Sequence, residues 1–148
     1  MPQIVTRGWL VDASQAGHVI EIADVGAIDP SPGDAVLFHT GWGAQWNDPE
    51  RYLSEEPGPG CAVAAWLAER GVALTGCDTW SHGPVPAEDP ARPFAVPQTL
   101  NVEHGVFIVE NLDTSELAAA GVREFCLVLT HPKLRGATGA WTSPIALV

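Results

Sequence analysis

The chain has 148 residues and a mass of 15.6 kDa, which is enough for one domain with a substantial buried core. An apolar fraction of 46% with six Trp excludes intrinsic disorder, while 15 Gly and 13 Pro predict many turns and ordered loops. Seven Lys and Arg against 18 Asp and Glu give a formal net charge of −11, so we expect neither nucleic acid nor a membrane as a partner.

The cysteines and the N-terminal residues predict the compartment. Cys61, Cys77 and Cys126 form no C-x-x-C pair, and their odd number favours reduced thiols over a disulfide framework. Residues 1–15 lack a basic start followed by an apolar stretch, and no apolar run approaches the roughly 20 residues that span a bilayer. We therefore expect a cytoplasmic protein.

The first 60 residues predict extended structure followed by a long loop. Apolar and β-branched runs predict strands at 4–11, 19–22 and 35–38. Residues 41–60 combine Gly, Pro, acidic and aromatic residues without periodicity, which is typical of an ordered loop.

The middle of the chain predicts an α/β unit. Residues 61–70 (CAVAAWLAER) place apolar side chains at helical spacing, and Gly71 is a C-terminal stop. A short strand at 72–77 follows directly, so that Asp78 stands at a strand end. Residues 80–98 contain five prolines and predict a long loop that faces substrate.

The last third predicts three further strands, at 106–109, 125–129 and 144–148, and a short helix at 112–120 that ends at Gly121. The chain as a whole thus predicts six or seven strands and two or three helices in an α/β arrangement.

Residues 33–43 (GDAVLFHTGWG) closely resemble the cyclase family, the metal-dependent hydrolases that include bacterial kynurenine formamidase and isatin hydrolase. The resemblance continues, in the family's order and spacing, at 65–74, 78–80, 109–112, 133–139 and 144–146. It implies one cyclase-family domain over 1–148, with the family's swivelling β/β/α-like fold: a mixed sheet or barrel-like β layer with packed helices. It also implies a homo-oligomer, since family members resemble dimers with active sites near subunit contacts.

Part of the family's metal site has no counterpart in these residues. The resemblance implies a metal held mainly by an N-terminal motif of the form H-x-G-T-H-x-D-x-P, which does not occur here, and residues 7–12 (RGWLVD) resemble the segment that follows it. At 94–98 (FAVPQ) the family usually has V-H-Q, whereas this chain has Pro97. Only Glu110 matches a family ligand, and one carboxylate does not make a transition-metal site. We therefore expect an N-terminally shortened member without its own metal.

Three side chains are candidates for acid/base catalysis: Glu110, Asp78 and His82. Glu110 follows an apolar strand and the resemblance places it at the active site, although a carboxylate at a helix N-terminus explains it equally well. Asp78 ends a strand, a common place for ligand contacts, and is equally typical of a turn. His82 lies in the loop after Asp78 and offers an imidazole for proton transfer.

Aromatic residues provide candidates for substrate binding, namely Trp42, Trp46, Tyr52 and Trp80, because aromatic rings stack on planar ligands. Packing in the core or in a dimer explains them as well. His39, on a buried strand, is more typical of a core or subunit-contact residue, and Cys77 of an inert buried thiol.

The leading hypothesis is therefore an enzyme of cyclase or lyase type, without a cofactor, that dehydrates, isomerises or cyclises a small organic molecule, with biosynthesis of a specialised metabolite as one setting. The first alternative is a hydrolase of amides or lactams, dependent on zinc or manganese and completed by a partner chain. The second alternative is a non-catalytic protein that binds a small molecule or serves as a scaffold.

Overall fold

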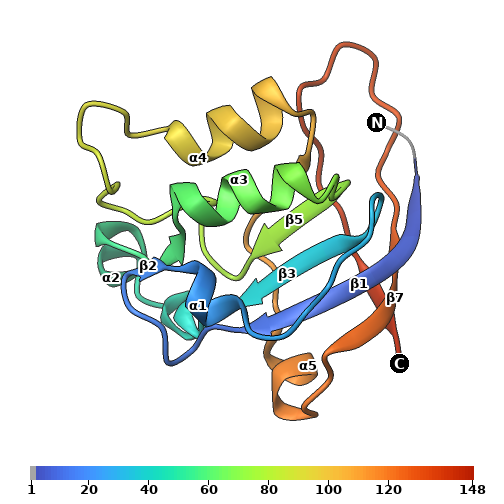
Figure 1. The fold of residues 1–148 in the computed structure, drawn as a ribbon, viewed down its shortest axis with the longest axis horizontal. Coiled ribbons are helices and arrows are strands. Elements are labelled where there is room, and N and C mark those ends of the chain that lie inside the picture. The colour runs from blue at the N-terminus through green and yellow to red at the C-terminus, as the bar shows by residue number, and fades with distance from the viewer. Residues whose placement is uncertain (1–2) are drawn as a thin grey trace.

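A computed structural model describes residues 3–148 of the chain. Its main sheet contains β1 (Ile4–Asp12), β3 (Ala35–His39), β5 (Leu74–Cys77), β6 (Phe107–Val109), β7 (Glu124–Leu129) and β8 (Ile145–Leu147). The spatial order is β6-β5-β3-β1-β7-β8. Strands β6, β5, β3 and β1 are parallel to one another, β7 is antiparallel to β1, and β8 is antiparallel to β7. The expected mixed sheet of an α/β fold is thus confirmed (Figure 1).

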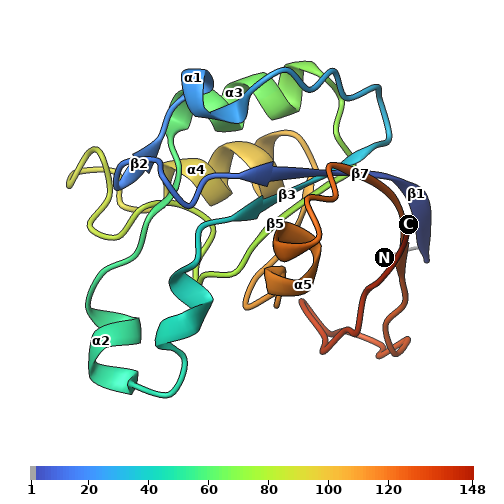
Figure 2. The ribbon, with the colours of Figure 1, turned by 90° about the horizontal axis from the view of Figure 1, so that it is seen from below.

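Short elements complete the fold. Strands β2 (Val19–Ile20) and β4 (Gly58–Pro59) form a separate two-stranded ladder. The helices are α1 (Ile22–Val25), η1 (Trp42–Gln45), α2 (Pro49–Ser54), α3 (Cys61–Glu69), α4 (Ala95–Pro97), η2 (Gln98–Glu103) and α5 (Ser115–Ala119). Seen along the sheet, α1, α3 and α4 cover one face, while α5 and the C-terminal segment lie on the other (Figure 2).

Alternating side chains of the central strands build a core on each face of the sheet. Val36 and Phe38 of β3 pack in one cluster with Val63 and Leu67 of α3, and Leu37 packs in a second cluster under α5. Both faces of β3 are buried because helices connect the parallel strands, which explains its uninterrupted apolar run. Gly71 ends α3 in a left-handed conformation with φ 67°, as the sequence predicted.

Three expected elements differ from the structure. The strand expected at 19–22 ends at Ile20, because Glu21 begins the short helix α1 and forms a reciprocal capping box with Asp24. The loop expected at 41–60 contains η1, α2 and strand β4. The loop expected at 80–98 contains α4 and the first residue of η2. Pro97 is tolerated in α4 because its missing N–H falls in the first helical turn, where amides have no intrahelical acceptor.

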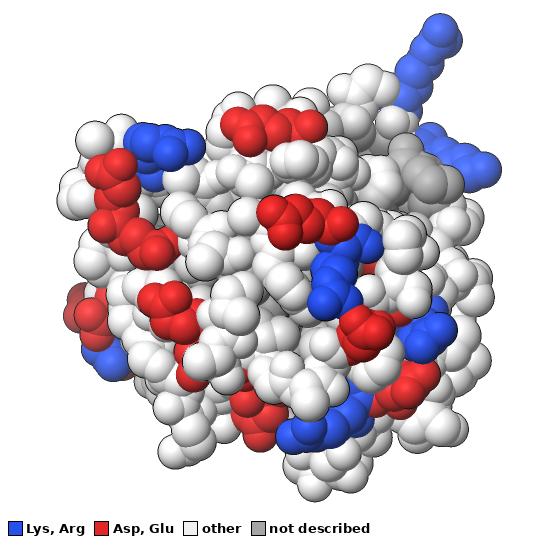
Figure 3. Space-filling view, in the orientation of Figure 1, with Lys and Arg blue, Asp and Glu red and all other residues white. Residues whose placement is uncertain are grey.

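The surface of the described chain carries acidic groups in several places. Figure 3 shows acidic side chains scattered over one face between uncharged and basic groups, rather than gathered in a single patch. On the face of α5, the C-terminal segment 131–148 lines a broad hollow and leaves Trp141 95% exposed. Within residues 3–148, no helix is long and apolar enough to cross a membrane.

Candidate active site

The polar residues of the candidate site lie where the parallel strands end. His39 is the last residue of β3, Asp78 directly follows β5, and Glu110 directly follows β6. The registers Phe38 to Cys77 and Gly76 to Val109 bring these strand ends to one edge of the sheet. Ligand sites of open α/β sheets form at the carboxyl ends of parallel strands, so this edge is the natural place for chemistry.

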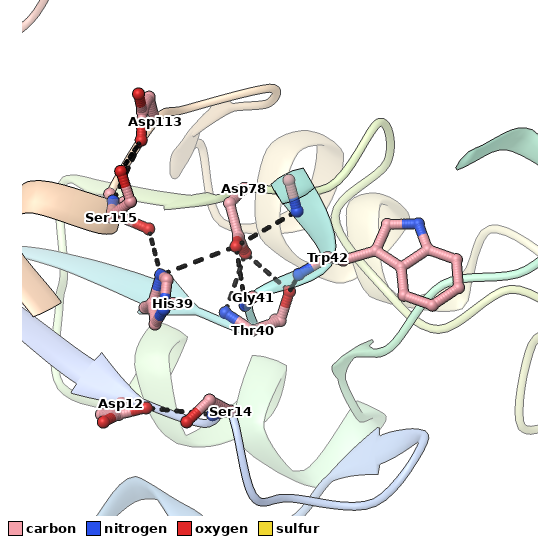
Figure 4. Close-up of polar contacts among 11 residues, drawn as sticks. Asp12, Ser14, His39, Thr40, Gly41, Trp42, Asp78, Asp113 and Ser115 are labelled. Carbon is pink, nitrogen blue, oxygen red and sulfur yellow. Dashed lines mark hydrogen bonds and ion pairs between the residues drawn. The ribbon is translucent and has the colours of Figure 1, made fainter. Parts of the chain in front are cut away.

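Asp78 is a buried carboxylate that organises the neighbouring turn. Its Oδ1 accepts hydrogen bonds from the backbone N–H and the hydroxyl of Thr40, at 2.8 and 2.6 Å, and its Oδ2 accepts from Gly41 N–H at 2.8 Å (Figure 4). These three short hydrogen bonds, together with a longer one of 3.5 Å from Gly43 N–H to Oδ2, fix the direction in which the chain leaves β3. Asp78 thereby sets the start of η1.

His39 lies between Asp78 and the start of α5. Its Nδ1 lies 2.8 Å from the hydroxyl of Thr114 and 3.6 Å from Oδ2 of Asp78. Thr114 is buried at the start of α5. The half-buried imidazole therefore joins the end of β3 to α5 through polar contacts.

Glu110 is an exposed carboxyl group at this edge. Burial of its carboxyl among neighbouring protein atoms raises the pKa, and a hydrogen bond from the backbone N–H of His82 offsets part of that rise. The chain folds back after β6, with Asn111 N–H donating to the Thr79 carbonyl at 2.8 Å. Glu110 is thus held beside the loop that follows β5.

Glu56 belongs to the same group of carboxyls and was not singled out from the sequence. It is fully buried, and its two oxygens accept hydrogen bonds from the backbone N–H groups of Trp80 and Ser81 at 2.8 and 2.9 Å. Burial, together with the charges of Glu110 and Asp78, raises the pKa of Glu56 to about 8. Nothing in the Pro- and Gly-rich segment around it distinguishes this carboxylate from its exposed neighbours, because its burial arises from contacts with a distant loop.

His82 lies inside the protein rather than on the open edge. Its Nε2 is 3.2 Å from the hydroxyl of Thr75, its ring meets Phe38 edge to face, and it is fully buried. Burial lowers the pKa of His82 to about 3, so the ring is neutral at neutral pH. The backbone N–H of His82 therefore faces Glu110, while its side chain is directed away from solvent.

The aromatic residues of the 42–52 segment pack against one another at the same end of the sheet. The Trp42 indole donates to the Tyr52 carbonyl at 3.2 Å, and Trp46, 61% exposed, stacks edge to face on Tyr52 with ring centroids 5.4 Å apart. The Tyr52 hydroxyl donates to Oδ1 of Asn111 at 2.8 Å, which supports the positive φ of 56° at Asn111. Tyr52 thus connects these aromatic residues to the residue beside Glu110.

The described residues do not by themselves fit a metal ion. Across residues 3–148, no group of three or more His, Cys, Asp or Glu side chains is placed to hold one. The oxygens of Asp78 and Glu56 are already engaged by hydrogen-bond donors of the protein. Glu110 is exposed, but one carboxylate is fewer than the three protein ligands that a zinc site uses.

Comparison with known proteins identifies the family. The family model described as "Putative cyclase" matches residues 1–84, more than half of the chain. The chain belongs to the Cyclase family. The family resemblance of the sequence motifs is thereby confirmed.

Solved structures of cyclase and hydrolase proteins share the fold. A crystal structure described as a novel cyclase is 25% identical with a TM-score of 0.77, and the match covers 96% of this chain and 53% of that protein. An isatin hydrolase bound to thioisatinate, a product analogue, is 18% identical with a TM-score of 0.79, covering 98% of this chain and 60% of that protein. Isatin hydrolase A from Ralstonia solanacearum is 21% identical with a TM-score of 0.77, covering 97% and 60%.

The Cyclase-family chain spans 53% to 60% of the length of these three structures. None of the curated proteins matches the chain. The comparisons therefore establish the family and the fold, and leave the activity to be argued from the residues.

Proposed function

We propose that this Cyclase-family chain is an enzyme that acts on a small organic molecule by proton transfer, with Glu110 as the acid and base. The observation that carries the proposal is the position of Glu110: it follows β6 at the carboxyl edge, reaches solvent, and has a pKa raised by burial. A carboxyl whose pKa moves toward neutrality both accepts and returns protons efficiently.

In a dehydration, the Glu110 carboxylate removes a proton from one atom of the substrate. The resulting carboxylic acid gives a proton to the leaving hydroxyl, which departs as water while the electron pair of the broken bond to hydrogen forms the new double bond. An isomerisation uses the same two transfers between two atoms of the substrate. Both reactions leave Glu110 in its starting state, so no further reactant is consumed.

Asp78 and His82 support this chemistry as positioning residues in the proposal. Asp78 fixes the Thr40–Gly41 turn through its three short hydrogen bonds, and this turn leads into Trp42. His82 directs its backbone N–H at the Glu110 carboxylate and keeps that group oriented. Trp42, Trp46 and Tyr52 form the aromatic wall proposed to hold the substrate on the Asn111 side.

A second candidate function is metal-dependent hydrolysis of an amide or lactam, with ligands supplied from outside residues 3–148. Two similar structures are isatin hydrolases. Another, to which this chain is 20% identical, is described as a potential metal-dependent hydrolase with cyclase activity. Glu110 would supply one carboxylate ligand in that case, and a partner chain the others. The two candidates differ in their requirement for a metal ion.

Steady-state assays of purified protein on small cyclic amides, including isatin, and on hydroxylated carbonyl compounds test the proposal. Each assay is run with a chelator and, separately, with added Mn²⁺ or Zn²⁺. We expect turnover in the presence of chelator, and we expect Glu110→Gln to lower kcat by about 100-fold or more, because general acid/base groups contribute about that much. Glu103→Gln, an exposed carboxyl on η2, is the matched control and should keep the wild-type rate.

The assays separate the candidate functions. A Glu110→Gln protein with unchanged kcat contradicts the role proposed for Glu110. Turnover that depends on Mn²⁺ or Zn²⁺ favours the hydrolase. Ligand binding without turnover in every assay favours a protein that only binds its small molecule.

A further inference from the structure

Glu56 is a buried carboxyl group that the proposed reaction does not use. It lies between α2 and β4, and its Oε2 and Oε1 accept hydrogen bonds from the backbone N–H groups of Trp80 and Ser81 at 2.8 and 2.9 Å. The next N–H along the chain, that of His82, binds Glu110. Three consecutive backbone N–H groups of the Trp80–His82 stretch therefore bind two carboxyl groups.

Residue 56 also holds the end of the loop 80–85 through its backbone. The N–H of Glu56 donates to the Val85 carbonyl at 2.9 Å, and the N–H of Val85 donates to the Glu56 carbonyl at 3.0 Å. Between these contacts Gly58 lies so close to Gly83 that an added Cβ atom would be 2.4 Å from its carbonyl carbon. The loop is thus bound to residue 56 at its beginning and at its end.

The segment that carries Glu56 is itself anchored to β2. The N–H of Gly58 donates to the His18 carbonyl at 3.1 Å, and that of Gly60 donates to the Ile20 carbonyl at 3.0 Å. These bonds belong to the parallel pairing of β2 with β4. The Glu56 carboxyl therefore has a defined position, and so do the N–H groups that bind it.

The side-chain nitrogens of the Trp80–His82 stretch do not orient it. Among the described residues, Trp80 Nε1 and His82 Nδ1 are the buried side-chain nitrogen or oxygen atoms without a hydrogen bond. The Thr79 hydroxyl donates to the Ser81 carbonyl at 2.7 Å, which fixes the start of the stretch. The direction of its N–H groups then depends on the bonds to Glu56.

The titratable groups that face Glu56 come from three elements. Asp78 follows β5, Glu110 follows β6, and Tyr52 belongs to α2. Burial and the charges of the three carboxyls raise the pKa of Tyr52 to about 12, so its phenol is neutral at neutral pH. Burial, with repulsion from Glu110 and Asp78, raises the pKa of Glu56 to about 8 against the effect of its two N–H donors. Below that pH, Glu56 and a glutamine in its place carry the same charge.

We propose that Glu56 is a positioning residue for Glu110: its carboxyl group fixes the Trp80–His82 stretch so that the His82 N–H stays directed at the Glu110 carboxylate. This inference rests on the proposed function, because it assigns the residue that orients the acid/base group of that reaction. An N–H that donates to a carboxylate stabilises its charged form and lowers the pKa. Glu56 thereby sets the pH at which Glu110 becomes able to accept a proton.

The test is a pH titration of full-length protein with ¹³C-labelled glutamate carboxyl groups, followed by NMR in the wild type and in Glu56→Gln. Glutamine keeps one acceptor oxygen and turns an NH2 group toward the other N–H, which displaces the stretch. Glu110→Gln identifies the signal of Glu110. We expect the midpoint of Glu110 in Glu56→Gln to lie about 0.5 pH or more above that of the wild type, because the His82 bond to the charged form is weakened.

Glu55→Gln is the matched control. It changes the adjacent carboxyl, which is exposed and pairs with Arg51, and should leave the midpoint of Glu110 at the wild-type value. A Glu110 midpoint in Glu56→Gln equal to that of the wild type overturns the proposal.

A second measurement uses the wild-type protein, so that it does not depend on the folding of a variant. In ¹⁵N-¹H spectra, the amide signals of Trp80 and Ser81 should shift with the ionisation of Glu56, near pH 8. The amide signal of His82 should shift with Glu110 at lower pH and a second time with Glu56. A His82 amide signal without the second transition shows that the stretch does not respond to Glu56, and contradicts the proposal.

Neither measurement needs turnover, so this inference and the proposed function fail separately. An unchanged midpoint of Glu110, in a protein whose kcat falls in Glu110→Gln, contradicts the role of Glu56 alone. A raised midpoint in a protein that turns over none of the substrates contradicts the proposed reaction alone. Where turnover is found, the acidic limb of kcat/KM should move to higher pH in Glu56→Gln by the same amount as the midpoint of Glu110.

Discussion

Asp78 is a single residue whose position in the sequence suggested catalysis but whose contacts in the fold are structural. At the end of β5 its carboxylate accepts hydrogen bonds from three donors of the Thr40–Gly41 turn, and the residue is buried. The sequence indicated its place at the end of β5, but the direction of its hydrogen bonds follows from the parallel pairing of β5 with β3.

Replacement of Asp78 with Asn tests this structural role. Asn keeps one acceptor oxygen and presents an NH2 group to the donors that faced the other oxygen, so we expect Asp78→Asn to lower the free energy of unfolding by about 2–3 kcal/mol. Urea denaturation followed by circular dichroism measures the change. Asp29→Asn is the control: it removes only the exposed ion pair with Arg70 and should cost less than about 1 kcal/mol. Equal stabilities of the two variants would contradict the assignment.

At the scale of the element, close backbone approach holds the 80–85 loop against β4. Added to Gly58, a Cβ atom would lie 2.4 Å from the carbonyl carbon of Gly83, and a backbone atom cannot rotate away as a flexible side chain can. The bridge between Glu56 and Val85 lies beside this contact. The absence of a side chain at Gly58 therefore allows the loop to reach both Glu56 and the strand.

Gly58→Ala should consequently displace the loop and destabilise the fold. Overpacking of this kind costs about 1–3 kcal/mol, and we expect a loss of free energy of unfolding in that range together with a changed environment of Trp80. Urea denaturation measures the first and the indole N–H signal of Trp80 the second. Gly139→Ala is the control, because nothing lies within 4 Å of its Cβ position. A Gly58→Ala protein as stable as Gly139→Ala would show that the close approach is not required.

At the scale of the whole molecule, two buried titratable groups predict how stability depends on pH. Glu56 holds its proton to a pH of about 8 in the folded protein but releases it near its ordinary pKa of 4.5 in the unfolded chain. Its contribution to stability is therefore full below pH 4.5 and decreases as the pH rises to about 8. His82 acts in the opposite sense, because the folded protein keeps it neutral down to a pKa of about 3 while the unfolded chain protonates it near 6.5.

The two effects oppose each other between pH 4.5 and 6.5, so we expect greatest stability in that range. Between pH 6.5 and 8, Glu56 alone should lower the free energy of unfolding by up to about 1.4 kcal/mol per pH unit. Urea denaturation from pH 4 to 9 measures the profile, and Glu56→Gln should flatten its alkaline side. A wild-type protein equally stable at pH 6 and pH 8.5 would contradict the burial of an uncompensated carboxyl at position 56.

The family, the central strands, helix α3 and the strand-end positions of Asp78 and Glu110 could all be predicted from the sequence. These follow from local pattern: apolar runs in β3 and β5, helical spacing ended by Gly71, and motifs read in order along the chain. The short helix α1 and the helical segment after Phe94 were not predicted, because capping by Glu21 and packing of η2 on α3 outweigh weak local preferences.

Which polar groups are buried and which are accessible could not be predicted from the sequence, because it depends on contacts between distant segments. No feature of the sequence around Glu56 marks it, yet contact with the Trp80–Ser81 backbone buries it. The same loop buries the His82 ring and leaves the Trp80 indole nitrogen without a hydrogen bond. Hydrogen bonds of this kind join residues 24 or more positions apart, so no local pattern contains them. Burial and partners, which set both pKa and accessibility, are properties of the folded chain.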